Sequence, residues 1–361
     1  MFRLNLSLFN FVITIFGFFI LNYRIHNSQN LNDFSKNERM KISSIILYNR
    51  IPKTGSTSLT NAIAYDLCAK NGFNVIHLNM TKNRFAMNII DQASFIKNVT
   101  SWSTRLPAFY HGHVAFIDFS KFGYPNPIYI NMVREPFERL LSHYYFLRYG
   151  DNYRVGLKRS KADNNETFDE CVLRDGKDCQ SKQLWLQIPY FCGSHKFCSD
   201  IGNRLALETA KRNIVERYVL VGLTERMQDL ISLLERILPD FFNGASPHFL
   251  SMGEDRKNLR HTLRKVAPSE ATIEKIKSSQ EYKMERELYD FVASEFENYW
   301  NRVMDQNGKT SIEMWCFSIE SLKRAIKKAW DEMSDEMIAR VVDTWPSRLQ
   351  ACIDADGEYI E

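Results

Sequence analysis

The chain of 361 residues has little net charge. Lys and Arg number 47 against 43 Asp and Glu, which leaves a formal net charge of only +4. This composition does not predict nucleic acid as a partner, so any acidic ligand must be met by a local basic patch. The apolar and charged fractions, 44% and 25%, are those of an ordinary globular protein, which argues against wholesale disorder. No internal repeat is visible.

Charge is absent altogether between Arg3 and Arg24, where the segment LFNFVITIFGFFIL is densely apolar. Such a segment is long enough to cross a bilayer. No small-x-small cleavage site follows it, so an uncleaved signal anchor is favoured over a cleaved signal peptide. We therefore predict a short cytoplasmic end and a transmembrane helix over residues 1–24, followed by a polar stem over residues 25–40.

The cysteines contain no C-x-x-C pair, and no set of histidines completes a zinc site, so a metal is the weaker interpretation. They include two close pairs in polar loops, as local disulfides do in an oxidising compartment. These pairs are Cys171 with Cys179 and Cys192 with Cys198. Three glycosylation sequons begin at Asn79, Asn98 and Asn165. Together these features predict a type II membrane protein with its main domain in the lumen.

Between residues 41 and 306, apolar runs alternate with longer amphipathic stretches. The expected strands are Ile45–Tyr48, Asn74–Leu78, Ala108–His111, Ile128–Val133 and Tyr218–Gly222. The expected helices include Ser58–Lys70, Pro136–Phe146, Asn203–Arg212 and Glu225–Ile237. This alternation predicts an α/β fold in which helices flank a central parallel sheet. Ligands bind such sheets at the carboxyl ends of the strands.

A short loop, RIPKTGSTS, follows the first expected strand and precedes the first expected helix. Backbone N–H groups at a helix N-terminus favour an anion, and the hydroxyls and Lys53 add further donors. An ordinary capped turn is the alternative. The loop lacks the Gly-Lys order of a triphosphate loop, because Gly55 follows Lys53 and no second glycine stands at the required spacing. A nucleotide kinase is therefore disfavoured.

Two further motifs carry chemistry. Arg134 directly follows the strand-like run Ile128–Val133, and Ser142 lies two turns into the following helix. Such a pair can hold a phosphate. A salt bridge from Arg134 to Glu138 is the alternative.

His111 and His113 flank a glycine in FYHGHV. Two histidines at this spacing in a strand point to the same face. They indicate a metal half-site, a pair of core residues, or a catalytic base with a neighbour.

Taken in chain order, these motifs resemble the Golgi heparan sulfate 2-O-sulfotransferases, from about residue 45 to about residue 302. The segments that carry the resemblance are YNRIPKTGSTS, AYDLCAKN, FYHGHV, PIYINMVREPFERLLSHYYFLR, FDECV, LWLQIPYFCG and YVLVGLTE. The family's fold is a phosphate-loop sulfotransferase fold. Its co-substrate is 3′-phosphoadenosine 5′-phosphosulfate, and the resemblance implies that no metal is needed.

The resemblance also implies roles for individual residues. The residues expected to hold the 5′-phosphosulfate are Lys53, Thr54, Gly55, Ser56, Thr57 and Ser58. The residues expected around the 3′-phosphate and over the nucleotide are Arg134, Ser142, Arg260 and Thr262. His113 matches the catalytic base, Lys53 would stabilise charge on the departing oxygen, and His111 would support His113 or contact the acceptor.

The expected reaction is in-line transfer of a sulfuryl group to the 2-hydroxyl of a uronic acid, mainly iduronate, in heparan sulfate. A uronyl 2-O-sulfotransferase acting on dermatan or chondroitin and a non-catalytic heparan-binding membrane protein are the alternatives. By itself the basic segment YRVGLKRSK reads as a solvated loop. The resemblance makes its Arg154 and Arg159 acceptor contacts, together with Arg50, Tyr65 and His77. For Tyr65 and His77, plain packing is the alternative.

Residues 307–361 depart from the family. Their AW…VVDTWPSRLQACIDADG pattern resembles the end of a Tc1/mariner-type transposase without its catalytic core, so no transposase activity is implied. A captured exon, an incorrectly assembled gene and a divergent helical ending are the alternative explanations. The resemblance further implies a Golgi membrane location and a homo-trimer, and this tail replaces the segment through which relatives pack their subunits.

Overall fold

The computed structural model describes residues 44–79, 85–151, 154, 156–257, 262 and 264–304, all of which belong to one unit. The predicted anchor and stem, Arg260 and the tail after residue 306 lie outside the described residues. Within the described part of the chain, no helix combines the length and the apolar character needed to cross a membrane.

The centre of the fold is a five-stranded sheet in which every neighbouring pair of strands is parallel. Its order is β2-β3-β1-β4-β5. The strands are β1 (Ile45–Asn49), β2 (Asn74–Leu78), β3 (Ala108–Gly112), β4 (Ile128–Val133) and β5 (Tyr218–Leu223). All five expected strands are confirmed to within a residue at either end. Their apolar runs are continuous because helices cover both faces of the sheet.

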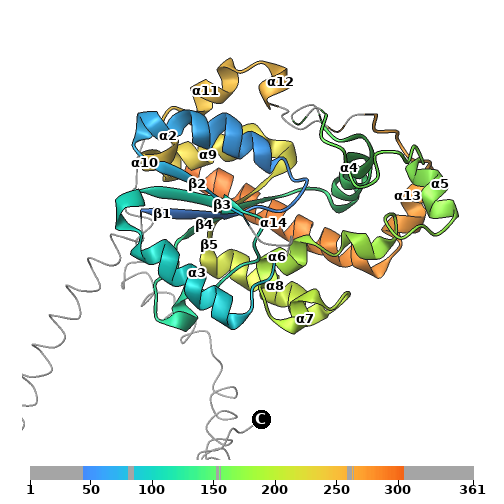
Figure 1. The fold of residues 1–361 in the computed structure, drawn as a ribbon, viewed down its shortest axis with the longest axis horizontal. Coiled ribbons are helices and arrows are strands. Elements are labelled where there is room, and N and C mark those ends of the chain that lie inside the picture. The colour runs from blue at the N-terminus through green and yellow to red at the C-terminus, as the bar shows by residue number, and fades with distance from the viewer. Residues whose placement is uncertain are drawn as a thin grey trace, which may run out of the picture. The chain divides into compact units, whose positions relative to one another are not determined.

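Helices connect the strands, and several of them pack on the sheet. They are α2 (Tyr65–Asn71), α3 (Ile89–Ser101), α4 (Pro136–Tyr149), α5 (Phe168–Leu173), α6 (Gln187–Cys192), α7 (Lys196–Ser199), α8 (Arg204–Arg217), α9 (Met227–Ile237), α10 (Pro239–Phe242), α11 (Ala245–Ser251), α12 (Glu254–Lys257), α13 (Glu270–Lys277) and α14 (Gln280–Met304). Figure 1 shows α2, α9, α10 and α11 over one face of the sheet and α3, α6 and α8 over the other.

Two buried apolar clusters follow from this layering. One joins the sheet to α3, α6 and α8, and the other joins it to α2, α9, α10 and α11. The long helix α14 contributes to both, through Leu288 to the first and Phe296 to the second. Because the sheet is covered on both faces, ligands reach it only at its edges, and the loops after β1, β3, β4 and β5 all emerge at the carboxyl edge.

The first expected helix departs from regular geometry where it meets the loop after β1. A π-helix spans Ser58–Ala64, and α2 continues from it directly. The hydroxyl of Thr60 donates to the carbonyl oxygens of Ser56 and Thr57 at 3.0 and 3.3 Å. A side-chain donor within the backbone ladder is a recognised cause of irregular helix, and π-turns occur often at functional sites.

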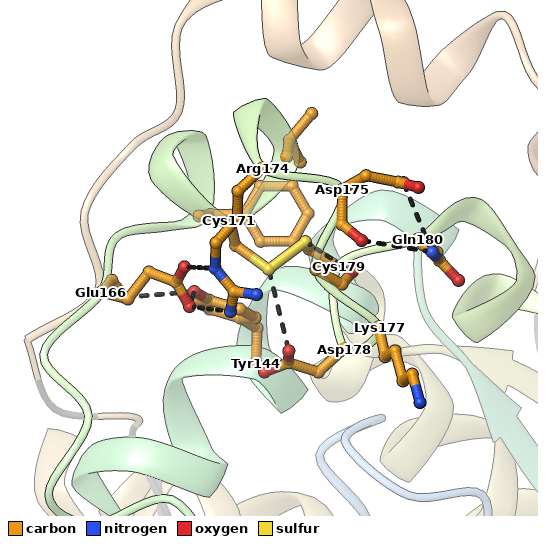
Figure 2. Close-up of a disulfide and its surroundings, with 12 residues drawn as sticks. Tyr144, Glu166, Cys171, Arg174, Asp175, Lys177, Asp178, Cys179 and Gln180 are labelled. Carbon is orange, nitrogen blue, oxygen red and sulfur yellow. Dashed lines mark hydrogen bonds and ion pairs between the residues drawn. A yellow bond between two sulfur atoms is a disulfide. The ribbon is translucent and has the colours of Figure 1, made fainter.

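A smaller apolar cluster lies beyond the sheet, where α4 packs with α5 and α13. The disulfide Cys171–Cys179 closes a loop here, with Glu166, Arg174 and Asp178 around it (Figure 2). The second disulfide, Cys192–Cys198, joins the end of α6 to α7. Both expected disulfide pairs are therefore confirmed. The asparagines of the three sequons are all exposed.

Candidate active site

A cavity of about 470 Å³ opens at the carboxyl edge of the sheet. Among the described residues that line it, five side chains are cationic and none is a carboxylate. The cations are Arg50, Lys53, Arg134, Lys257 and Lys265. Hydroxyl groups of Ser56, Thr57, Ser58, Ser142 and Thr262 lie among them. Cations and hydroxyl donors are the groups that bind phosphate and sulfate, so the cavity suits an anion with more than one charged group.

The loop after β1 has an unusual backbone. Gly55 has φ of 75°, and Lys53, which is not glycine, has φ of 69°. A positive φ in a residue with a side chain costs free energy, and such outliers cluster at functional sites. Thr54 is buried and its hydroxyl donates to the carbonyl of Ile51 at 3.0 Å, which fixes the turn from within. The Thr54 side chain thus helps to hold the shape of the loop.

Thr262 connects two parts of the predicted nucleotide site. The Lys53 ammonium donates to the Thr262 hydroxyl at 3.1 Å, although the two residues are 209 positions apart. The same hydroxyl lies 3.1 Å from the Ser142 hydroxyl on α4. The structure therefore brings Lys53, Ser142 and Thr262 together. Lys53 also lies over the Phe146 ring, 4.4 Å from its centroid, which holds the ammonium at the cavity wall.

Arg134 leaves the end of β4 and lines the same cavity. Its guanidinium donates to the carbonyl of Lys53 at 3.4 Å and lies 3.6 Å from the Glu138 carboxylate. The salt bridge to Glu138 weighed from the sequence is therefore present. Because Arg134 is only partly buried, its ion pair with Glu138 contributes little to the stability of the fold. The guanidinium still lines the cavity while it makes this pair.

One ring nitrogen of His113 bonds to the backbone of Arg50. Its Nδ1 lies 2.8 Å from the carbonyl oxygen of Arg50, and since a carbonyl only accepts, Nδ1 carries the proton. Nε2 then holds the lone pair of the neutral ring, which is the tautomer that a general base requires. β3 ends at Gly112. Glycine is needed at this position because a Cβ atom on it would lie 2.6 Å from the side chain of Leu78. His113 thus stands beyond the strand, so the same-face relation expected of two strand histidines does not apply.

His111 differs from His113 in its burial and in its hydrogen-bond partners. It is buried, with 2% of its surface exposed. Its Nδ1 accepts from Arg50 at 3.1 Å, so Nε2 carries the proton and donates to the Tyr65 hydroxyl at 3.2 Å. Burial, and then the Arg50 charge, lowers the pKa of His111 to about 3. His111 is placed to orient Arg50 and Tyr65 as a neutral ring.

We expect His111 to remain neutral from pH 5 to pH 8, because burial and Arg50 hold its pKa far below the usual range for histidine. Its ring resonances in an NMR pH titration should not shift over this interval. The unfolded chain binds a proton at His111 below about pH 6.5, so this group weakens the fold as the pH falls. A His111 titration near neutrality would contradict the hydrogen-bond assignment.

Comparison with known proteins assigns the family. The sulfotransferase family profile matches residues 39–292. A heparan sulfate 2-O-sulfotransferase of Caenorhabditis elegans, hst-2, is 62% identical over 255 residues, which is 71% of this chain and 79% of that protein. The human heparan sulfate 2-O-sulfotransferase 1 is 51% identical over 254 residues, 70% of each chain. The chain belongs to the heparan sulfate 2-O-sulfotransferase family. The tail's likeness to a transposase stays a prediction, since the profile ends before it.

In this 2-O-sulfotransferase the predicted acceptor residues fall into two groups. The first surrounds His111: His77 stacks on it with ring centroids 4.9 Å apart, Tyr65 meets its edge, and Arg50 contacts its Nδ1. β2 and β3 place His77 and His111 at the same register position. Tyr65 is 43% exposed and His77 is exposed as well, so both remain accessible to a ligand.

The second group lies in the basic segment after α4. Asp151 accepts from the backbone N–H of Arg154 at 2.9 Å and from the Arg159 guanidinium at 3.4 Å. Arg159 lies over the Phe146 ring, 4.4 Å from its centroid, on a side chain that is mostly buried. Arg154 is exposed. Of the two, Arg154 therefore has the freer access to solvent, while Arg159 is held against Asp151 and Phe146.

Several cavity residues of the sulfotransferase were not predicted from the sequence. They include His143, Phe146, Thr224, Met227, Phe249, Lys257 and Lys265. Thr224 could have been predicted, because it directly follows β5 at the edge of the sheet where ligands bind. Its hydroxyl donates to the carbonyls of Thr54 and Val133 at 2.9 Å each. It thus ties the loop after β1 to the end of β4. Burial lowers the pKa of His143 to about 4, so this ring is neutral at pH 7.

Proposed function

We propose that the chain transfers a sulfuryl group from 3′-phosphoadenosine 5′-phosphosulfate to the 2-hydroxyl of a uronic acid, mainly iduronate, in heparan sulfate. The relatives named as heparan sulfate 2-O-sulfotransferases are 50–62% identical over about 70% of the chain. The observation that carries the chemical assignment is the convergence of Lys53, Ser142, Thr262 and His113 on one cationic cavity.

The residues present fit this donor. Hydroxyls and N–H groups of the loop Lys53–Ser58 would hold the 5′-phosphosulfate, at the start of the π-helix. Arg134 and Ser142 would hold the 3′-phosphate, and Thr262 would close over the nucleotide with Arg260 of the same segment. The donor supplies a sulfuryl group on a phosphate leaving group. None of the described residues that line the cavity is a carboxylate that would repel it.

His113 would act as the base. Its Nε2 would take the proton of the acceptor 2-hydroxyl, and the Arg50 carbonyl would stabilise the imidazolium through Nδ1. Lys53 would neutralise the charge that develops on the bridging oxygen as the sulfur–oxygen bond breaks. Its contacts with Thr262 and Phe146 hold the ammonium in place beforehand, which is the preorganisation that such stabilisation needs. His111 would act as a neutral support for Arg50.

The acceptor would lie across Arg50, Tyr65, His77, Arg154 and Arg159. Heparan sulfate carries sulfate and carboxylate groups, which arginine binds with paired hydrogen bonds. Burial, and then the charges of Arg50 and Arg154, lowers the pKa of His77, which indicates that cations from two segments meet around it. A polyanion would bind these arginine side chains without any rearrangement of the sheet.

We further propose that the enzyme is anchored in the Golgi membrane with this domain in the lumen, and that it forms a homo-oligomer. The two disulfides and the three exposed sequon asparagines support a lumenal location, since disulfides persist in oxidising compartments. No step of the proposed mechanism calls for a metal ion.

The deciding experiment measures transfer of radiolabelled sulfate from the donor to 2-O-desulfated heparin, followed by disaccharide analysis. We expect label in disaccharides that carry a 2-O-sulfated uronic acid. Heparin that already bears its 2-O-sulfates serves as the control and should take up little label. Label on dermatan but not heparan would favour the uronyl enzyme, and heparin binding without transfer would contradict catalysis.

A further inference from the structure

A buried hydrogen-bond relay runs from α14 to Arg134 and has no part in the mechanism above. Gln187, the first residue of α6, has none of its surface exposed. Its side-chain oxygen accepts from the backbone N–H of Arg134 at 3.0 Å, and its side-chain nitrogen donates to the backbone carbonyl of Arg134 at 3.0 Å. The Gln187 amide therefore bonds both the backbone N–H and the backbone carbonyl of Arg134, which lies 53 positions earlier in the chain.

Glu285 of α14 holds this amide in place. Its carboxylate is fully buried and accepts from the backbone N–H groups of Leu186, Gln187 and Ile188 at 2.8, 3.3 and 3.1 Å. It also accepts from the side-chain nitrogen of Gln187 at 3.3 Å. A carboxylate that receives N–H groups at the start of a helix fixes both the helix and any side chain it contacts. The orientation of the Gln187 amide is thus determined by Glu285.

The far end of the relay is the nucleotide cavity. Arg134 lies between the last residue of β4, Val133, and the N-cap of α4, Glu135, so its own backbone belongs to neither element. Its guanidinium lines the cavity and donates to the carbonyl of Lys53 at 3.4 Å. A small rotation of this backbone would move the guanidinium by much more, because the side chain is long.

We propose that Gln187, held by Glu285, is a positioning residue that aims Arg134 at the 3′-phosphate of the nucleotide. The inference rests on the proposed function, which makes Arg134 part of the nucleotide site. It predicts that the relay sets discrimination between nucleotides with and without a 3′-phosphate, and not the affinity for the nucleotide in general.

The test is calorimetric titration of the purified full-length chain with adenosine 3′,5′-bisphosphate and with adenosine 5′-monophosphate. Gln187→Met keeps the length and burial of the side chain but removes its polar atoms. We expect this variant to lose about tenfold of the preference for the bisphosphate, the scale of one hydrogen bond to a charged group. Its affinity for the monophosphate should change by less than about twofold, since that ligand does not use Arg134.

A double-mutant cycle separates positioning from general damage. Arg134→Ala should abolish most of the preference, and adding Gln187→Met to it should then change little, because the relay has nothing left to position. Asn213→Leu is the matched control: this buried amide donates to the carbonyls of Phe191 and Cys192 at the other end of α6. It should lower the melting temperature and leave the nucleotide preference at the wild-type value.

If Gln187→Met fails to fold, Glu285→Gln decides the question, because it keeps the shape of the side chain and weakens its hold on Gln187. A wild-type preference in the folded relay variant, or independent effects of the two substitutions in the cycle, would overturn the inference. If the wild-type chain itself shows no preference for the bisphosphate, the proposed nucleotide site fails instead, so the two failures are distinguishable.

Discussion

Replacing His113 by alanine should reduce sulfate transfer by about 10²- to 10⁴-fold, the usual contribution of a general base. The reason is the ring's tautomer. The Arg50 carbonyl, 2.8 Å from Nδ1, fixes the proton there and leaves Nε2 to accept one from the acceptor hydroxyl. No other described histidine offers that arrangement at the cavity: His111 has both nitrogens engaged, and burial lowers the pKa of His143 to about 4.

The measurement is radiolabel transfer to 2-O-desulfated heparin, together with calorimetric binding of adenosine 3′,5′-bisphosphate. Nucleotide affinity should stay within about threefold of the wild type, because the proposed phosphate contacts come from other residues. His195→Ala, at an exposed histidine far along the chain, is the control and should leave transfer unchanged. Full activity in His113→Ala would remove this residue from the role of base.

Replacing Arg148 by methionine should lower the free energy of unfolding by about 3–5 kcal/mol, the cost of removing one partner from a buried ion pair. The Arg148 side chain is fully buried and donates to Asp178 at 2.7 Å and to Glu166 at 3.1 Å. Its guanidinium lies over the Tyr144 ring, 3.5 Å from the centroid. Methionine fills similar space but leaves two carboxylates without their shared cation.

Arg174 supplies the matched control, because it pairs with the same Glu166 from an exposed position (Figure 2). It is the main cause of the lowered pKa of Glu166, which falls to about 2. Water can nevertheless replace an exposed arginine, so Arg174→Met should change stability little. Urea unfolding of both variants decides the matter. Equal stability losses in the two variants would show that burial of Arg148 does not determine its contribution.

The strands could be predicted closely because each is a continuous apolar run in a sheet covered on both faces. Helix ends were less predictable. Pro136–Phe146 extends to Tyr149, and the segment Ser58–Lys70 divides into a π-helix and α2. That division depends on the Thr60 hydroxyl and the carbonyls of Ser56 and Thr57, a contact that helix propensity does not encode.

The candidate site was predictable where its residues form contiguous motifs. Lys53 to Ser58, Arg134 and His113 stand at strand ends and could be read directly, and the resemblance added Thr262. The residues that position the site residues could not be predicted from the sequence. Gln187 and Glu285 are about a hundred residues apart and lie in ordinary helical patterns, so only the folded chain reveals their contact. The burial of Arg159 likewise depends on Asp151 and Phe146, which the basic segment alone does not indicate.

The separation of Lys53 and Thr262 by 209 positions has a consequence for biosynthesis. A nascent chain acquires the phosphate loop early, yet the hydroxyl that contacts the Lys53 ammonium is made only when most of the domain has been translated. Glu285, which holds the Gln187 amide, follows later still. Since chains fold from the N-terminus as they emerge, a truncated product has the loop without its partners. A chain that ends before residue 262 therefore lacks the hydroxyl that contacts the Lys53 ammonium, even though its phosphate loop is complete.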